Sequence, residues 1–298
     1  MCIRAIDYCP PVDITFGDFL RAIITADSDL AINDDKYHYR LAFINAFRRR
    51  GIYPVNLKSL SEQSLRYQNP RFNEKTKKDI EILIKFLREY RERILYETDR
   101  KKIYDLTKTY IAGSRHVTGL HRRLKSKLKR TYEFEKLTGI IFNWDKFYFD
   151  SALKKEKPSF TVQNLRVVSR VGPDGKQINQ IVFSLIQQMG VVIEDGKFQR
   201  YYNIKNEPRP TGGFEVSGGS TLIFDLDSEG MELKYAIAKP LFEPKKKEGD
   251  ERVPSQRVIE QFKYQRDELP LAATEINQYF GLGHDNKFGQ IFSILHRC

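Results

Sequence analysis

The spacing of apolar side chains changes near Pro158, and this change constrains the fold more than any other feature of the sequence. Before Pro158 apolar residues recur every three or four positions, and beyond it they recur at every second position. The first spacing is typical of helices that bury one face, and the second is typical of strands. With 298 residues and 40% hydrophobic side chains, the chain has ample material for a core. It is therefore predicted to be an α+β protein.

The same pattern divides the chain into four regions. We expect helical N-terminal and middle regions, then a small antiparallel β-region and a partly helical tail. The boundaries are a helical segment at 1–66, a helical, basic middle region at 67–157, an antiparallel β-region at 158–242, and a charged linker and tail at 243–298.

Within the helical half, three local signals set the element boundaries. Thr15 opens a segment whose apolar residues follow helical spacing, and Gly51 suits the end of a second helix. The clearest helix is predicted to begin near Asn73, because Ile80, Leu83 and the residues that follow keep helical spacing.

Two hairpins are predicted in the β-region. Strands around 160–168 and 181–185 flank Pro173-Asp174-Gly175, which is strong turn chemistry. Strands 221–227 and 233–237 flank a second turn at 228–230. The pairs Gly212-Gly213 and Gly218-Gly219 are interpreted as loops before the second hairpin.

Sequence motifs give no catalytic or metal site. Neither a His-Glu-x-x-His helix nor a Gly-x-Ser-x-Gly turn occurs, so no catalytic, cofactor or metal residue is assigned. Cys2, Cys9 and Cys298 are interpreted as ordinary thiols, with a Cys2–Cys9 disulfide as the alternative.

The histidines and paired acids give no site motif either. His116 and His121 lie five residues apart, which favours solvated or phosphate-facing side chains over a metal pair. His38 is predicted to be partly buried in a structural role. Asp225 and Asp227 would share one strand face, either as a carboxylate pair or as solvent-facing residues.

Positive charge is concentrated in one segment. The chain carries 51 Lys and Arg against 39 Asp and Glu, a net charge of +12, and residues 100–136 hold twelve of the cations and only three acids. Leu120, Leu124 and Leu128 would form one helical stripe beneath them, with Lys108 extending the positive face. The candidate anion or nucleic-acid contacts are Arg115, Arg122, Arg123, Lys125, Lys127, Lys129 and Arg130.

Two interpretations of this basic segment stand side by side. A nucleic-acid or acidic-protein module would use the cations to bind phosphates or carboxylates, with affinity that falls steeply with salt. A solvated helix face accounts for the same residues, and no base-reading motif accompanies them.

The first fifty residues resemble the last segment of thermolysin-like zinc metallopeptidases of the gluzincin group. The resemblance rests on a helix, a Pro-containing break, a second helix and a final helix ending in glycine. The residues that carry it are the phrases at 3–16, 20–22, 26–27 and 42–52, and the strand at 218–226 is similar to a β-containing C-terminal region of related bacterial proteins. The match covers about a sixth of the chain.

The resemblance implies a noncatalytic C-terminal accessory portion that is inactive alone. The family's zinc-binding His and Glu residues lie before the matched segment, so zinc is expected only in a full-length parent. Its partner would be the missing catalytic part or a second copy, because the apolar stripes of 1–52 would otherwise be exposed. No stretch approaches the ~18–20 apolar residues of a membrane span.

Overall fold

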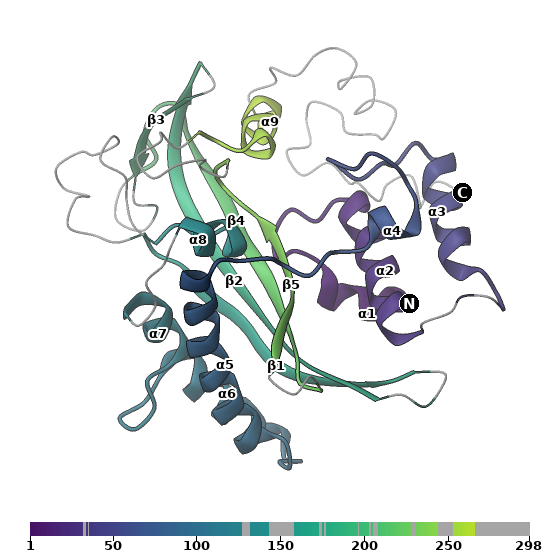
Figure 1. Ribbon diagram of the computed structural model, residues 1–298. Coiled ribbons are helices and arrows are strands. Elements are labelled where there is room, and N and C mark those ends of the chain that lie inside the picture. The colour runs from purple at the N-terminus through teal and green to yellow at the C-terminus, as the bar shows by residue number, and fades with distance from the viewer. Residues whose placement is uncertain are drawn as a thin grey trace.

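A computed structural model describes most of the chain. The described residues are 1–31, 34, 36–126, 132–142, 158–172, 175, 177–195, 197–202, 204, 208–227, 231–243 and 253–265. Figure 1 shows a curved sheet with helices on both sides of it.

The predicted α+β class is confirmed. Short helices and two longer ones open the chain: α1 (Cys2–Ala5), η1 (Ile6–Tyr8), α2 (Phe16–Leu30), α3 (Tyr39–Arg49) and α4 (Glu62–Leu65). The middle region follows as α5 (Glu74–Ile94), α6 (Arg100–Ala112), α7 (Leu120–Ser126) and α8 (Tyr132–Thr138). The sheet consists of β1 (Thr161–Val171), β2 (Gln177–Glu194), β3 (Lys197–Tyr202), β4 (Gly213–Asp225) and β5 (Glu232–Lys239), and α9 (Gln256–Gln265) comes last.

The long strand β2 organises the antiparallel sheet. The strand order is β1-β2-β4-β5, and β3 pairs with the second half of β2. The β1–β2 and β4–β5 pairings confirm both predicted hairpins. Pro173, Asp174 and the turn at 228–230 lie outside the described residues.

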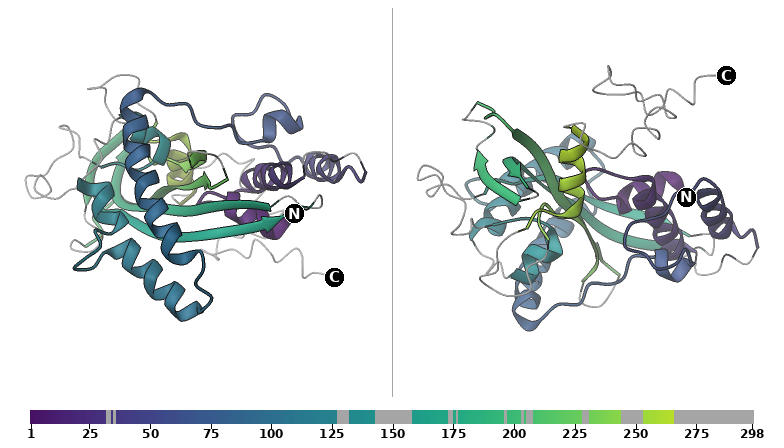
Figure 2. Two further views of the ribbon diagram at one scale, coloured as in Figure 1. Left: turned by 60° about the horizontal axis from the view of Figure 1, so that its bottom comes forward. Right: turned by 90° about the horizontal axis from the view of Figure 1, so that it is seen from above.

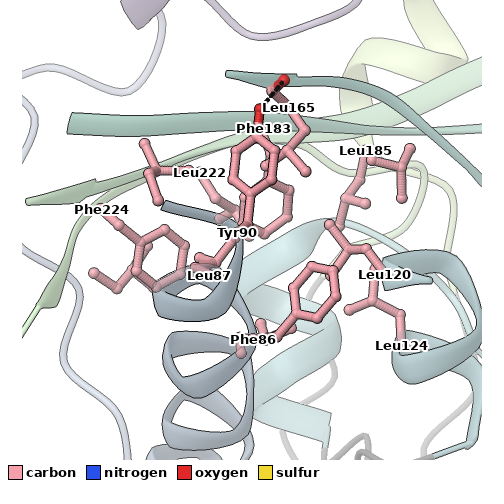
Figure 3. Packing of buried hydrophobic residues seen from close by; sticks show 14 of the residues in the cluster. Phe86, Leu87, Tyr90, Leu120, Leu124, Leu165, Phe183, Leu185, Leu222 and Phe224 are labelled. Carbon is pink, nitrogen blue, oxygen red and sulfur yellow. Dashed lines mark hydrogen bonds between the residues drawn. The ribbon is translucent and has the colours of Figure 1, made fainter. Parts of the chain in front are cut away.

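One face of the sheet packs against α5, α6, α7 and α8. Figure 3 shows Phe183, Leu185 and neighbouring strand residues meeting Leu87 and Tyr90 of α5. The Tyr90 hydroxyl donates a hydrogen bond to the carbonyl oxygen of Leu165 in β1 at 3.3 Å. Helix α5 begins as predicted, since the Asn73 side chain accepts a hydrogen bond from the Thr76 backbone N–H at 2.9 Å.

The opposite face of the sheet packs against the N-terminal helices. Val182 and Ile223, which alternate with the residues facing α5, contact a cluster that includes Tyr8 and Ile23. The chain's own sheet therefore covers one side of α2, at Ile23, while Ile44 of α3 and Leu65 of α4 pack against Leu20 and Ile24. Most of the stripe that sequence analysis expected to be exposed is thus buried within the chain.

A polar clamp joins this helical layer to the sheet. The carboxylate of Asp29 accepts hydrogen bonds from the hydroxyls of Tyr8 and Tyr235, each at 2.8 Å, and lies 3.1 Å from the Lys234 ammonium. Burial, together with the charge of Asp29, raises the pKa of both tyrosines, so both remain protonated donors.

Helix α9 packs on the far end of the sheet. Val258 and Phe262 join a cluster with Phe214 of β4, and the rings of Phe214 and Phe262 lie 5.6 Å apart edge to face. Arg257 forms an ion pair with Asp13 and donates to the carbonyl oxygen of Ser217 at 2.9 Å. The helix confirms that the tail is partly helical. Most of the linker, 244–252, and the tail beyond 265 lie outside the described residues.

Two local predictions were wrong. Gly218 and Gly219 lie within β4 rather than in a loop, and a Cβ atom on Gly219 would overlap the carbonyl oxygen of Leu185 in β2. Glycine is required at this position because the backbone of the neighbouring strand comes close. In the sequence alone, such a glycine pair looks like a loop signal. His38 is exposed rather than partly buried, and it adopts a left-handed conformation (φ 50°) at the start of α3.

Other details agree with expectation. Gly51 follows α3 with a φ of 67°, as its role at the helix end requires. Cys2 and Cys9 are free thiols, so the alternative disulfide is not formed. Within the described part of the chain, none of the helices combines the length and apolar character that a bilayer crossing requires.

Replacing Asp29 with Ala should destabilise the protein by about 3 kcal/mol, because two buried hydroxyls and the Lys234 ammonium lose their shared acceptor. Urea unfolding at pH 7 measures this change in the free energy of unfolding. Asp105→Ala, which removes an exposed carboxylate on α6, should change it by less than about 0.5 kcal/mol. Equal effects of the two variants would contradict the clamp.

Candidate nucleic-acid interface

Helix α6 is anchored by its inner face. It begins at Asp99, whose side chain accepts a hydrogen bond from the Lys101 backbone N–H at 2.8 Å. Tyr110 is buried, with its ring 5.4 Å from Phe86 and 5.3 Å from Tyr90 of α5. The outer face of α6 is therefore held in a fixed orientation.

That outer face carries a row of two cations and one aromatic ring. Lys101, Tyr104 and Lys108 follow one another at intervals of three and four residues, so they lie along one side of the helix. All three are exposed, and Tyr104 has 64% of its surface accessible. We call these three residues the α6 row. Figure 2 shows α6 with α5 and α7 on one side of the sheet, away from α2 and α3.

The loop after α6 adds a further cation. The backbones of Gly113 and Gly119 are in contact, so a Cβ on Gly113 would lie 2.9 Å from the Gly119 nitrogen. The Ser114 backbone N–H donates to the carbonyl oxygen of Val117 at 2.8 Å. This closed loop holds Arg115 exposed to solvent. Arg115 is one of the candidate anion contacts of the sequence analysis.

On α7 the predicted contacts separate into two kinds. Arg123 donates to the carbonyl oxygen of Thr118 at 3.1 Å and lies 4.8 Å above the Phe86 ring, with Glu89 at 3.7 Å. Lys125 lies 5.6 Å from the centre of the Phe160 ring and is partly buried. Arg122, by contrast, is exposed.

The candidate residues are thus only partly brought together as a surface. Arg115 and Arg122 are exposed cations, whereas Arg123 and Lys125 contact the chain itself. Leu120 and Leu124 are buried as predicted. Lys127, Leu128, Lys129 and Arg130 lie outside the described residues.

Sequence analysis missed Lys101 and Tyr104. The density of cations points to 115–130 and to Lys108, whereas Lys101 and Tyr104 stand out only when the residues of α6 are sorted by helical spacing. The available signal was the spacing of these residues with Ile103 and Tyr110 as the inward-facing positions. Charge density identifies a basic segment, whereas only the helix orientation identifies its exposed side.

The two histidines of this region do not act as a pair. His121 Nε2 lies 2.9 Å from the carbonyl oxygen of Phe160, and burial lowers the pKa of its imidazole. His116 is exposed at the tip of the loop. In the described ranges, no three His, Cys, Asp or Glu side chains gather as a metal-binding group.

The two acids at the end of β4 accept hydrogen bonds from β2 and from neighbouring backbone. The Asp227 carboxylate accepts from the backbone N–H and side-chain amide of Asn179, at 2.8 and 2.9 Å. Asp225 accepts from the Asp227 backbone N–H at 2.9 Å.

Of the cysteines, Cys9 is buried, and burial together with the nearby Asp18 raises the pKa of its thiol to about 11.

Comparisons of the chain with protein-family models, with curated proteins and with solved structures gave no match.

Removing Arg123 should lower stability, whereas removing Arg122 should not. Arg123→Ala loses a hydrogen bond and its stacking on Phe86, so we expect a cost of about 1 to 2 kcal/mol. Arg122→Ala should change the free energy of unfolding by less than about 0.5 kcal/mol. Urea unfolding of both variants measures these changes in the free energy of unfolding. A larger loss of stability for Arg122→Ala than for Arg123→Ala would contradict the assignment of Arg123 as the structural residue.

Proposed function

We propose that this chain is a noncatalytic module that binds single-stranded nucleic acid through the α6 row, with Arg115 and Arg122 as further phosphate contacts. The exposed ring of Tyr104 between Lys101 and Lys108 carries the proposal. Ammonium groups on either side of an accessible aromatic ring match a strand whose phosphates and bases alternate.

Charge supports a polyanion as the ligand. The described residues 100–126 include eight Lys and Arg and a single acid, Asp105. Lys102 lies 3.9 Å from Glu97 at the edge of this surface, whereas Lys101 and Lys108 belong to the outward row. Long-range attraction would therefore bring phosphates to this side of the helical layer.

The aromatic ring favours a single strand over a duplex. In a duplex the base faces are covered by their stacked neighbours, so Tyr104 could contact only the backbone. In a single strand a base can stack on the ring, and such stacking contributes about 1 to 3 kcal/mol per base. An acidic protein would use the lysines but gain little from the ring.

The test is binding of a fluorescein-labelled oligothymidylate of about 20 nucleotides to the full chain, followed by anisotropy. Tyr104→Ala should weaken binding about tenfold or more, and Tyr104→Phe should preserve it, since the π-face remains. The double variant Lys101→Ala with Lys108→Ala should also weaken binding. The slope of log affinity against log salt concentration should fall by the amount expected for the loss of about one to two phosphate contacts.

Lys263→Ala on α9 is the matched control, because it removes an exposed cation from another part of the molecule. The proposal is overturned if the control weakens binding as much as the α6-row variants do. It is also overturned if a duplex of the same length, or polyglutamate, binds more tightly than the single strand.

A separate proposal follows from the resemblance of residues 1–52 to thermolysin-like peptidases: the chain acts as an accessory portion of a metallopeptidase-related protein. The exposed side chains of Ile3, Ile6 and Phe16 in this segment favour it, because they leave apolar surface for a partner. The proposal assigns no metal ligand or catalytic residue to this chain.

This proposal predicts that the purified chain holds no stoichiometric zinc and hydrolyses no peptides, since it lacks the His-Glu-x-x-His motif. Elemental analysis by mass spectrometry and a casein assay with and without a chelator measure both. Zinc near one equivalent together with chelator-sensitive hydrolysis would refute the noncatalytic role.

A further inference from the structure

Four large apolar side chains are exposed where α2 begins and α3 ends. Gly17 contacts Pro54 so closely that a Cβ on Gly17 would lie 2.7 Å from the Pro54 Cα. This contact joins the segment with Ile14 and Phe16 to the segment with Tyr53 and Val55. The four side chains, here named the Phe16 patch, are 54%, 57%, 60% and 75% exposed in that order.

Their exposure contrasts with the burial of the residues that follow them in α2. The next turns of α2 bury Leu20, Ile23 and Ile24 almost completely. Large exposed apolar side chains gathered at one place are typical of contact surfaces, whereas single ones are not. The Phe16 patch thus lies on a rigid support and has solvent-accessible apolar surface of its own.

The rim of the patch is basic. Arg48, Arg49 and Arg50 are exposed at the end of α3, directly before the turn that leads to Tyr53. Lys58 follows the patch and is also exposed, and residues 36–61 contain no Asp or Glu.

The acids nearest in sequence are already engaged. Asp13 is paired with Arg257 of α9, and the Asp18 carboxylate lies 2.6 Å from the Lys239 ammonium and caps α2 through Thr15. Their charges are balanced within the chain, so the arginines set the sign of the electrostatic potential beside the patch.

We propose that the Phe16 patch docks an acidic amphipathic segment of another protein, with its apolar side chains on the patch and its carboxylates on Arg48, Arg49 and Arg50. Arginine forms bidentate hydrogen bonds with carboxylates. Aromatic residues and arginine are also enriched among the residues that dominate protein–protein binding.

Charge complementarity favours this occupant over a second copy of the chain. A second copy related by a two-fold axis would place one arginine cluster near its equivalent, which costs energy. A lipid surface with anionic headgroups would also bring phosphates to the arginines, and the vesicle measurement below distinguishes it from a peptide. A peptide can place its acidic groups over the arginines alone.

The probe is a fluorescein-labelled amphipathic peptide of about 18 residues, with leucines on one helical face and glutamates on the other. Its partner probe has lysine in place of every glutamate. Anisotropy with the full chain should show binding about tenfold or more tighter for the glutamate peptide. Equal affinity for the two peptides overturns the proposal.

Variants locate the binding on the surface. Phe16→Ser and Tyr53→Ser should each weaken binding of the glutamate peptide about tenfold. Arg48→Ala combined with Arg49→Ala should weaken it and flatten its salt dependence. Val171→Ser, which removes an apolar side chain that is 63% exposed at the end of β1, is the matched control and should bind normally. The proposal is overturned if Val171→Ser weakens binding of the glutamate peptide as much as the patch variants do.

Two further measurements exclude the other occupants. Sedimentation should show a monomer for the full chain at the concentrations used, and phosphatidylserine vesicles should not compete with the peptide. Self-association that Phe16→Ser abolishes would assign the patch to a second copy instead. Vesicle binding that the same substitution abolishes would assign it to a membrane surface.

Discussion

Burial of both faces of β2 is the constraint on which the rest of the structure depends. Phe183 and Leu185 face the α5 layer, while Val182 faces the N-terminal helices. A strand in this position needs helices on both sides, because either face left in water would expose a continuous apolar surface. The layers with the α6 row and the Phe16 patch are therefore fixed to the same central sheet (Figure 1).

Such a sheet must also satisfy the polar groups that it buries. The side chain of Gln187 accepts from the Ile141 backbone N–H at 2.9 Å and donates to the Ile141 carbonyl oxygen at 2.8 Å. The Thr221 hydroxyl donates to the carbonyl oxygen of Cys9 at 2.8 Å. These bonds cross from strand to covering segment, so they fix the position of each layer as well as offsetting the cost of burial. The Asp29 clamp does the same for α2.

The two proposed surfaces follow from how each layer meets the sheet. Tyr110 of α6 is buried against α5, whereas the residues of the α6 row, Lys101, Tyr104 and Lys108, are exposed. The N-terminal layer buries the middle of α2 and leaves its first residues exposed beside the arginines of α3. Both surfaces are basic, yet one offers a single stackable ring and the other a larger apolar contact. They therefore suit different ligands, and neither requires the other.

The sequence by itself determined the α+β class, the start of α5 at Asn73, the helix end at Gly51 and both hairpins, because these depend on spacing and on local caps and turns. Only the tertiary structure decided which cations are exposed and where the apolar stripe of α2 packs. Arg122 and Arg123 are adjacent in sequence, yet Arg123 reaches Phe86 on another helix. Gly219 resembles a loop residue locally, although a neighbouring strand is what excludes its side chain. Contacts between residues far apart in sequence set these outcomes, and no local pattern contains them.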